Sequence, residues 1–271
     1  MNFLELREKY PEFSYNWYKI EENENEYKIT YEFEIKGLSK FNPTWTIPKM
    51  DKSKNNIPNK ELLENMVFNL GMVELVSYWK ITCAPHVTVK NIYLSQKQID
   101  WWKKLYFYGL GEFFYKNNIK TNIDEFMNIT AGTNKLLKSE INISDEFTGA
   151  LVPIGGGKDS IVTLNVIKDD FANNMCYVIN PRGATEETAE TAGYGENKRC
   201  YVKRTLDKNM LELNKQGYLN GHTPFSSIVA FSALIVAYLN KKKYIVLSNE
   251  ASANESTIYE EEVNHQYSKS Y

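Results

Sequence analysis

A short glycine-rich segment is the part of the sequence best suited to chemistry. It consists of Gly155, Gly156, Gly157, Lys158, Asp159 and Ser160. The apolar run 150–154 before it predicts a strand, and the apolar spacing over 161–167 predicts a helix after it. Glycines let backbone N–H groups approach a phosphate closely, and the N-terminus of a helix favours negative charge. We therefore predict a nucleotide phosphate site at this turn.

The polar residues of this segment, and one arginine beyond it, have separate predicted roles. Lys158 adds a positive charge and Ser160 a hydroxyl group. Asp159 is an unusual neighbour for phosphate unless it organises Mg²⁺ or a bound water. Arg182 follows the predicted strand 176–179 and can contact a phosphate or a carboxylate with two N–H groups. The segment has neither the Walker spacing nor the dinucleotide-binding spacing.

Polar residues near the predicted ends of other elements are further candidates. His222 precedes a predicted helix over 225–239, where the alternative is a loop histidine that bonds the helix N-terminus. Glu250 follows a predicted strand and is a candidate for Mg²⁺ binding or base catalysis, with a solvated carboxylate as the alternative. His265 and Lys269 lie in a polar segment without periodicity, which is otherwise typical of an exposed terminus.

In the first half, the hydrophobic pattern predicts strands followed by helices. Apolar and polar residues alternate over 27–35, which predicts a strand with 13–20 as its hairpin partner, and 44–47 adds a third strand. An apolar stripe over 62–73 predicts an amphipathic helix, and Ser95 begins a second helix with capping-box spacing.

In the second half, strands alternate with helices, which predicts a doubly wound parallel sheet. Ligands of such sheets bind beyond the carboxyl ends of the strands, where the glycine-rich segment is expected. The polar stretch 117–144 separates the two patterns. We therefore predict an α/β fold in which a smaller α+β domain, 1–145, precedes a nucleotide-binding domain, 146–271.

Composition excludes several classes of protein. The chain has 271 residues and a formal charge of −2, so no extended basic surface for nucleic acid is expected. Its three cysteines form no C-x-x-C pair, which argues against a zinc ribbon or a disulfide framework. The N-terminus lacks a signal pattern, and the apolar run 228–239 is shorter than the roughly 20 residues of a membrane span. We expect a cytoplasmic protein without a membrane partner.

The glycine-rich segment resembles the PP-loop of the ATP pyrophosphatase superfamily, S-G-G-x-D-S, with Gly155 in place of the first serine. This resemblance implies an adenine nucleotide α-hydrolase-like fold and cleavage of ATP between its α- and β-phosphates. A narrower resemblance, to the ATP-dependent UDP-N-acetylmuramoyl-L-alanyl-L-glutamate epimerases of peptidoglycan synthesis, rests on five strings. They are LVSYWKITCA (75–84), YGLGEFFY (108–115), GHTPFSSIVAFSALIV (221–236), SNEASANES (248–256) and VNHQYSKS (263–270).

The narrower resemblance implies inversion of the terminal L-glutamate of a UDP-sugar dipeptide, with ATP and Mg²⁺ as cofactors. Adenylation of the glutamate carboxylate removes the charge that opposes loss of the α-proton, so a base on one face and an acid on the other can exchange it. His222, Glu250, His265 and Lys269 are the candidate proton-transfer residues, and Asp159 and Glu250 the candidate Mg²⁺ ligands.

Two alternatives remain open at this stage. One is a PP-loop enzyme that adenylates a tRNA base or a nucleoside, and the other is a non-catalytic nucleotide-binding module. The chains of the epimerase family continue past the HQYSKS segment, so we expect this chain to be a truncated form or a relative that lacks the C-terminal part.

Overall fold

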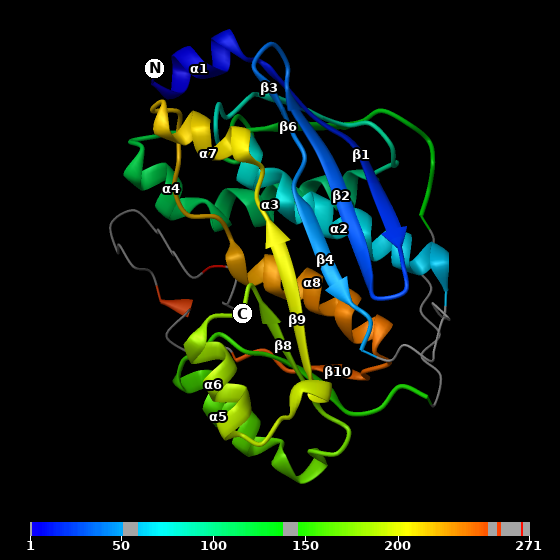
Figure 1. The fold of residues 1–271 in the computed structure, drawn as a ribbon. Coiled ribbons are helices and arrows are strands. Elements are labelled where there is room, and N and C mark those ends of the chain that lie inside the picture. Colours follow the sequence, from blue (N-terminus) through cyan, green and yellow to red (C-terminus); the bar gives the residue numbers. More distant parts are fainter. Residues whose placement is uncertain (1, 51–58, 138–145, 249–253, 256–266, 268–271) are drawn as a thin grey trace.

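The computed structural model describes residues 2–50, 59–137, 146–248, 254–255 and 267. Its first half contains α1 (Phe3–Lys9), β1 (Glu12–Glu22), β2 (Glu26–Ile35), β3 (Ser39–Phe41), β4 (Thr44–Pro48), α2 (Lys60–Trp79), β5 (His86–Val89), α3 (Gln96–Gly109), α4 (Gly111–Lys116) and β6 (Asn128–Ala131) (Figure 1). The alternating segments form the antiparallel hairpin β1–β2, as the sequence predicts. The predictions of β4, α2 and α3 are also confirmed, whereas α1, β3, β5, α4 and β6 were not predicted.

The second half continues the alternation of strands and helices. Its elements are β7 (Ala150–Pro153), α5 (Lys158–Val166), β8 (Met175–Ile179), α6 (Gly183–Thr191), β9 (Arg199–Thr205), α7 (Lys208–Lys215), α8 (Phe225–Leu239) and β10 (Tyr244–Ile245). The strands predicted over 150–154 and 176–179 are present as β7 and β8, the strand expected before Glu250 is β10, and the helices α5 and α8 are also present. The sequence pattern did not predict α6 or α7. Both helices are short, and most of their residues are polar and lie at the surface.

The described strands form one mixed ten-stranded sheet in the order β10-β7-β8-β9-β4-β2-β1-β5-β6, with β3 paired to β2. The strands β10, β7, β8 and β9 at one end of this order are parallel to one another, and so are β1, β5 and β6 at the other end. The pairs in the centre, β9–β4, β4–β2 and β2–β1, are antiparallel. The predicted parallel sheet therefore makes up one end of a larger sheet. Antiparallel pairing of β4 with β9, including Trp45 opposite Arg204, joins the two halves. The domain division at residue 145 stays a prediction.

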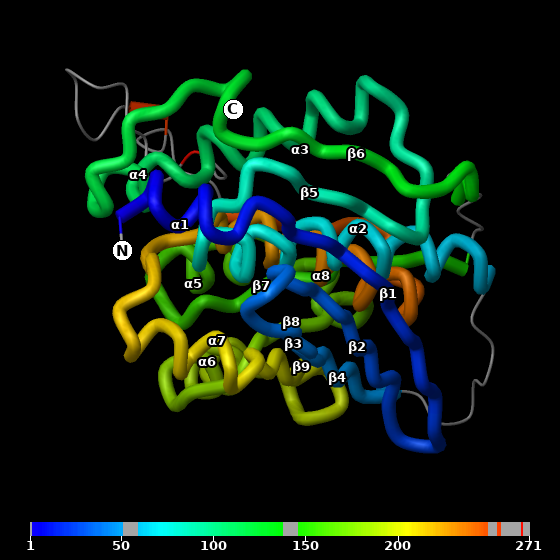
Figure 2. Tube along the Cα trace, turned by 90° about the horizontal axis from the view of Figure 1, so that it is seen from above, coloured from blue at the N-terminus to red at the C-terminus, as the bar shows by residue number. Residues whose placement is uncertain are grey.

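Helix α2 is buried on nearly every side, whereas the sequence predicted a single apolar stripe. Every residue from Leu70 to Trp79 is buried. The reason is that α2 packs against α8, β1 and β2 at once, and the Tyr106 hydroxyl of α3 donates a hydrogen bond to the Met72 carbonyl. Figure 2 shows α2 and α8 together in the middle of the molecule. As a result, the polar residues of α2 are held inside the core.

Helix α8 spans the predicted range Phe225–Leu239 and links the core to the parallel strands. It packs against α2 and against β7, β8 and β10. Because parallel crossovers are right-handed, α5 after β7 and α8 before β10 are expected on opposite faces of the sheet. In the part of the chain that the structure describes, neither α8 nor any other helix is long and apolar enough to cross a membrane.

Candidate functional site

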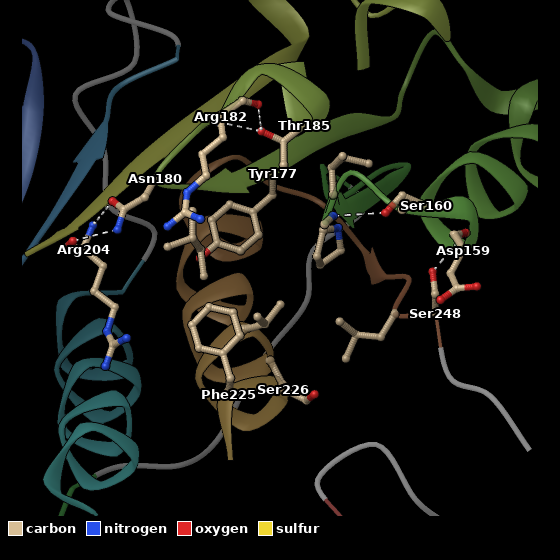
Figure 3. Close-up of a pocket in the computed structure, with 18 of the residues that line it drawn as sticks. Asp159, Ser160, Tyr177, Asn180, Arg182, Thr185, Arg204, Phe225, Ser226 and Ser248 are labelled. Carbon is tan, nitrogen blue, oxygen red and sulfur yellow. Dashed lines mark hydrogen bonds between the residues drawn. The ribbon is translucent and has the colours of Figure 1, made fainter. Parts of the chain in front are cut away.

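A cavity of about 740 Å³ lies at the carboxyl ends of the parallel strands. The chain moves from β7 to β8 and β9 on one side and returns to β10 on the other side of β7. Such a reversal of strand order opens a crevice where ligands bind. Figure 3 shows the side chains around this cavity. Its polar lining residues include Asp159, Ser160, Asn180, Arg182, Thr185, Arg204, Ser226 and Ser248, and its apolar ones Ile154, Ile179, Leu206, Phe225 and Val229.

The glycine-rich turn forms the end of this cavity next to β7. The Gly155 N–H donates a hydrogen bond of 3.0 Å to Ser160 Oγ, which closes the turn onto the first residues of α5. Gly156 has a φ of +79°, and a Cβ there would lie 3.2 Å from the backbone of α6 at Ala184 and Thr185. Any larger residue would strain this turn and push α6 away. Gly157 is the N-cap of α5 and makes no side-chain hydrogen bond to the first N–H groups of that helix.

The structure brings most of the predicted phosphate-binding residues to the cavity. Five of them line it: Gly155, Gly157, Asp159, Ser160 and Arg182. Gly156 lies in the same turn but faces α6. The exposed Lys158 is at the start of α5 and is not among the residues that line the cavity. Arg182 is the N-cap of α6, and its backbone N–H donates to the Thr185 hydroxyl.

The end of β10 is tied to the glycine-rich turn by hydroxyl groups. Ser248 Oγ lies 2.6 Å from the Thr163 hydroxyl of α5 and donates to the Asp159 carbonyl at 3.3 Å. These bonds bring the chain after β10 to the cavity, as expected for a strand beside the switch point. Glu250, two residues after Ser248, lies outside the described residues, and so do His265 and Lys269.

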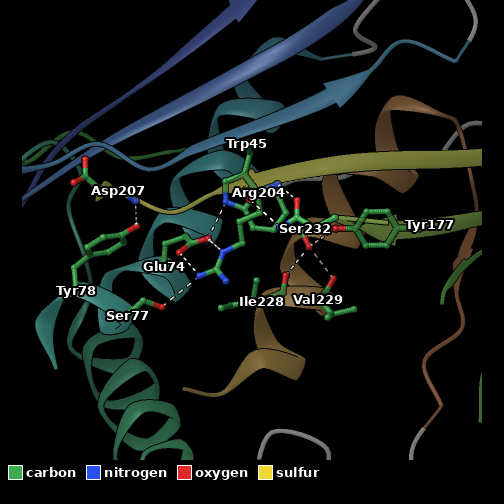
Figure 4. A network of polar contacts seen from close by, with 11 residues as sticks. Trp45, Glu74, Ser77, Tyr78, Tyr177, Arg204, Asp207, Ile228, Val229 and Ser232 are labelled. Atoms are coloured by element: carbon green, nitrogen blue, oxygen red, sulfur yellow. Dashed lines mark hydrogen bonds and ion pairs between the residues drawn. The ribbon is translucent and has the colours of Figure 1, made fainter. Parts of the chain in front are cut away.

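Arg204 is a cavity residue that the sequence did not reveal. Its Nε and Nη2 bind Glu74 Oε1 and Oε2 of α2 at 2.5 and 2.7 Å, and Trp45 Nε1 donates to the same carboxylate at 2.8 Å (Figure 4). Burial lowers the pKa of Arg204, but the Glu74 carboxylate outweighs burial and raises that pKa overall. Arg204 is therefore a fixed cation in the cavity wall. Glu74 is the single charged residue of the apolar stretch 66–79, and this was the signal that a buried partner exists.

His222 lies in the loop before α8, three residues ahead of the cavity residue Phe225. It is not part of the cavity lining. Its Nδ1 is 3.8 Å from Glu112 Oε2 of α4, and the other oxygen of Glu112 forms an ion pair with Lys116. The expected position near a helix N-terminus is confirmed, and Glu112 is a neighbour that no local sequence pattern predicts.

Other kinds of reactive site are less well supported. Burial raises the pKa of the Cys176 and Cys200 thiols to about 12, so both stay protonated near neutral pH. Within the described residues there is no group of three or more His, Cys, Asp or Glu side chains suited to hold a metal ion. Because Glu250 lies outside that range, the Mg²⁺ site predicted at Asp159 and Glu250 stays a prediction.

Comparison with known proteins gives a consistent assignment. A family model described as the MurL N-terminal domain matches residues 5–271. A UDP-N-acetyl-alpha-D-muramoyl-L-alanyl-L-glutamate epimerase from Salinispora tropica is 27% identical over 86% of this chain and 50% of its own length. Proteins of the same name from a Micromonospora species and from Xanthomonas oryzae pv. oryzae are 31% and 28% identical, each over 74% of this chain and 44% of their own length. The chain thus spans about half the length of these relatives. No solved structure matches it significantly.

Proposed function

Because the chain belongs to the MurL N-terminal domain family, we propose that it provides the nucleotide site of an ATP-dependent glutamate epimerase. The family match confirms the resemblance to the UDP-N-acetylmuramoyl-L-alanyl-L-glutamate epimerases that the sequence motifs suggested. The proposed reaction inverts the terminal L-glutamate of UDP-N-acetylmuramoyl-L-alanyl-L-glutamate and consumes ATP to AMP and pyrophosphate.

The position of the glycine-rich turn is the observation that supports ATP as the co-substrate. The turn faces a cavity at the switch point of a parallel sheet, and its residues offer N–H groups, the Ser160 hydroxyl and nearby Arg182 for phosphates. Ile179, Leu206 and Phe225 provide apolar wall area on the same cavity, which suits a nucleotide base. The volume of about 740 Å³ is within the range of small-molecule sites.

The two arginines that line the cavity suit activation of a carboxylate. We propose that the substrate glutamate carboxylate attacks the α-phosphate of ATP, forms an acyl-adenylate and releases pyrophosphate. Arg182 and Arg204 line the cavity and would stabilise the negative charge on the phosphates and on the incoming carboxylate. Loss of the carboxylate charge then makes the α-proton acidic enough for an ordinary side-chain base. Hydrolysis of the inverted adduct releases AMP.

Asp159 tests whether this turn is the ATP site. In the full natural protein, Asp159→Ala should abolish substrate-dependent pyrophosphate release and leave the circular dichroism spectrum unchanged. Asp169→Ala is the matched control, because Asp169 is an exposed acid shortly after α5 and is not a cavity residue. Equal pyrophosphate release by Asp159→Ala and the wild type would exclude the assignment of the turn.

Isotope exchange tests the inversion itself. In heavy water the product glutamate should carry deuterium at its α-carbon, and only when ATP is present, because inversion requires loss of the α-hydrogen. Binding or adenylation alone cannot produce this label. If ATP is cleaved with this substrate while no deuterium enters the product, the epimerase assignment is wrong and a ligase-type acceptor should replace it.

A further inference from the structure

The loop between α7 and α8 is fastened to the first half of the chain. It runs past α4 before α8 begins (Figure 1). Asn117 Nδ2, just after α4, donates a hydrogen bond of 3.1 Å to the Asn220 carbonyl. Lys80 Nζ, at the end of α2, donates one of 2.5 Å to the Gly221 carbonyl. Two consecutive peptide carbonyls are therefore held by side chains from two different helices.

The next turn of the loop is fixed by close packing. A Cβ on Gly109, the last residue of α3, would lie only 2.8 Å from Pro224 Cβ, so the two elements touch directly. Pro224 is the N-cap of α8, and Phe225 and Ser226 after it line the cavity. The position of His222 is thus set relative to the cavity by α2, α3 and α4 together. Such rigid support is what a catalytic side chain requires.

A carboxylate faces this histidine. Glu112 Oε2 is 3.8 Å from His222 Nδ1, while Lys116 forms an ion pair with the other oxygen of Glu112. At 3.8 Å the contact is longer than a hydrogen bond, so it places the negative charge of Glu112 beside Nδ1 without a direct bond to it. Glu112 and His222 come from separate strings of the family resemblance, YGLGEFFY and GHTP, which the fold brings together.

Lys80 is an unusual residue to use as an anchor. Its exposed fraction is 7%, and the Gly221 carbonyl is its hydrogen-bond partner in the part of the chain that the structure describes. Burial, followed by the charge of Arg204, lowers its pKa to about 8, although Cys83 acts weakly in the opposite direction. A buried ammonium without a carboxylate is costly to fold, so its presence beside the loop indicates a role other than stability.

We infer that Glu112 and Lys80 are positioning residues that hold His222 for proton transfer at the α-carbon of the substrate glutamate. The inference rests on the proposed function. In that step the α C–H bond breaks as an N–H bond forms at His222 Nε2, and the electron pair moves into the adenylated carbonyl. A second group on the opposite face returns a proton to the carbon, and His222 loses its own proton to solvent. Glu112 orients the ring, and Lys80 fixes the backbone that carries it.

The test separates proton exchange from adenylation in the full natural protein. Glu112→Gln should lower deuterium incorporation at the glutamate α-carbon by about tenfold or more, while substrate-dependent pyrophosphate release stays within about twofold. Lys80→Met should lower exchange in the same selective way. Glu125→Gln, at an exposed acid near α4, is the matched control and should change neither rate.

A double variant tests whether the carboxylate acts through the histidine. Glu112→Gln combined with His222→Gln should lose no more exchange than His222→Gln alone, because residues that act as a unit are not additive. The inference is overturned if the variants keep the wild-type ratio of exchange to pyrophosphate release, or if the losses multiply. Absence of ATP-dependent pyrophosphate release from the wild type would instead overturn the proposed function, and the inference with it.

Discussion

Two cations near helix α2, the buried Lys80 and the largely buried Arg204, have opposite electrostatic environments. Arg204 binds both oxygens of Glu74, and the carboxylate outweighs burial and raises the pKa of the arginine. Lys80 donates to the carbonyl of Gly221, and burial lowers its pKa to about 8. Burial disfavours both charges, so the presence or absence of a carboxylate partner decides the direction.

The two cations therefore have different roles, one in the stability of the fold and one in the position of a loop. The Glu74–Arg204 pair is compensated and links β9 to α2 at the cavity wall, so breaking it should harm the fold. Lys80 is uncompensated within the described residues and anchors the loop that carries His222, so removing its charge should stabilise the fold while it harms the reaction. The predictions that follow test this contrast from the largest effect to the smallest.

Removal of Glu74 should have the largest effect. Glu74→Leu leaves Arg204 buried without its carboxylate, and we expect the free energy of unfolding to fall by about 3 to 5 kcal/mol in urea titrations. The double variant Glu74→Leu/Arg204→Met removes both charges and should recover much of this loss. If the single and double variants are equally unstable, the pair is not the source of the effect.

Lys80→Met should change stability in the opposite direction. The lowering of the Lys80 pKa from 10.5 to about 8 corresponds to about 3 kcal/mol of cost for the charged form. Loss of the hydrogen bond to Gly221 offsets about 1 kcal/mol of that gain. We therefore expect the free energy of unfolding of the variant to be about 2 kcal/mol higher than that of the wild type at pH 7. A clear decrease in that free energy would contradict the contrast with Arg204.

The stabilisation by Lys80→Met should depend on pH. Because the folded protein binds the Lys80 proton more weakly than the unfolded chain, the wild type gains stability as the pH rises from about 8 toward 10.5. The full cost is present below pH 8. The difference between variant and wild type should therefore shrink across this window, as measured by urea midpoints at several pH values. A constant difference would mean that the charge of Lys80 is not responsible.

Ser77→Ala should have the smallest effect. The Ser77 hydroxyl lies 3.5 Å from Arg204 Nη2, at the limit of a hydrogen bond, while Glu74 already satisfies that nitrogen at 2.7 Å. We expect a change below about 0.5 kcal/mol in the free energy of unfolding. A decrease in the free energy of unfolding as large as that of Glu74→Leu would show that Glu74 alone does not stabilise the charge of Arg204.

The sequence by itself determined the local parts of the site. The strand, the glycine-rich turn and the helix of 150–166 follow one another within a short stretch, so spacing alone placed Ser160 and Asp159 at the turn between a strand and a helix. The sequence also determined the bounds of α8, which match the predicted range, because a continuous apolar run of this length is typical of a buried helix. The strings shared with the epimerases identified the family without any knowledge of the fold.

Only the tertiary structure decided which distant residues meet. Glu74 and Arg204 are 130 positions apart, and Lys80 and Gly221 are 141 apart. The antiparallel pairing of β4 with β9, which joins the two halves into one sheet, is equally non-local. Hydrophobic periodicity reports which face of an element is buried but not which partner covers it. The charge state of Lys80 and the neighbours of His222 depend on that partner, so they follow from packing and not from spacing along the chain.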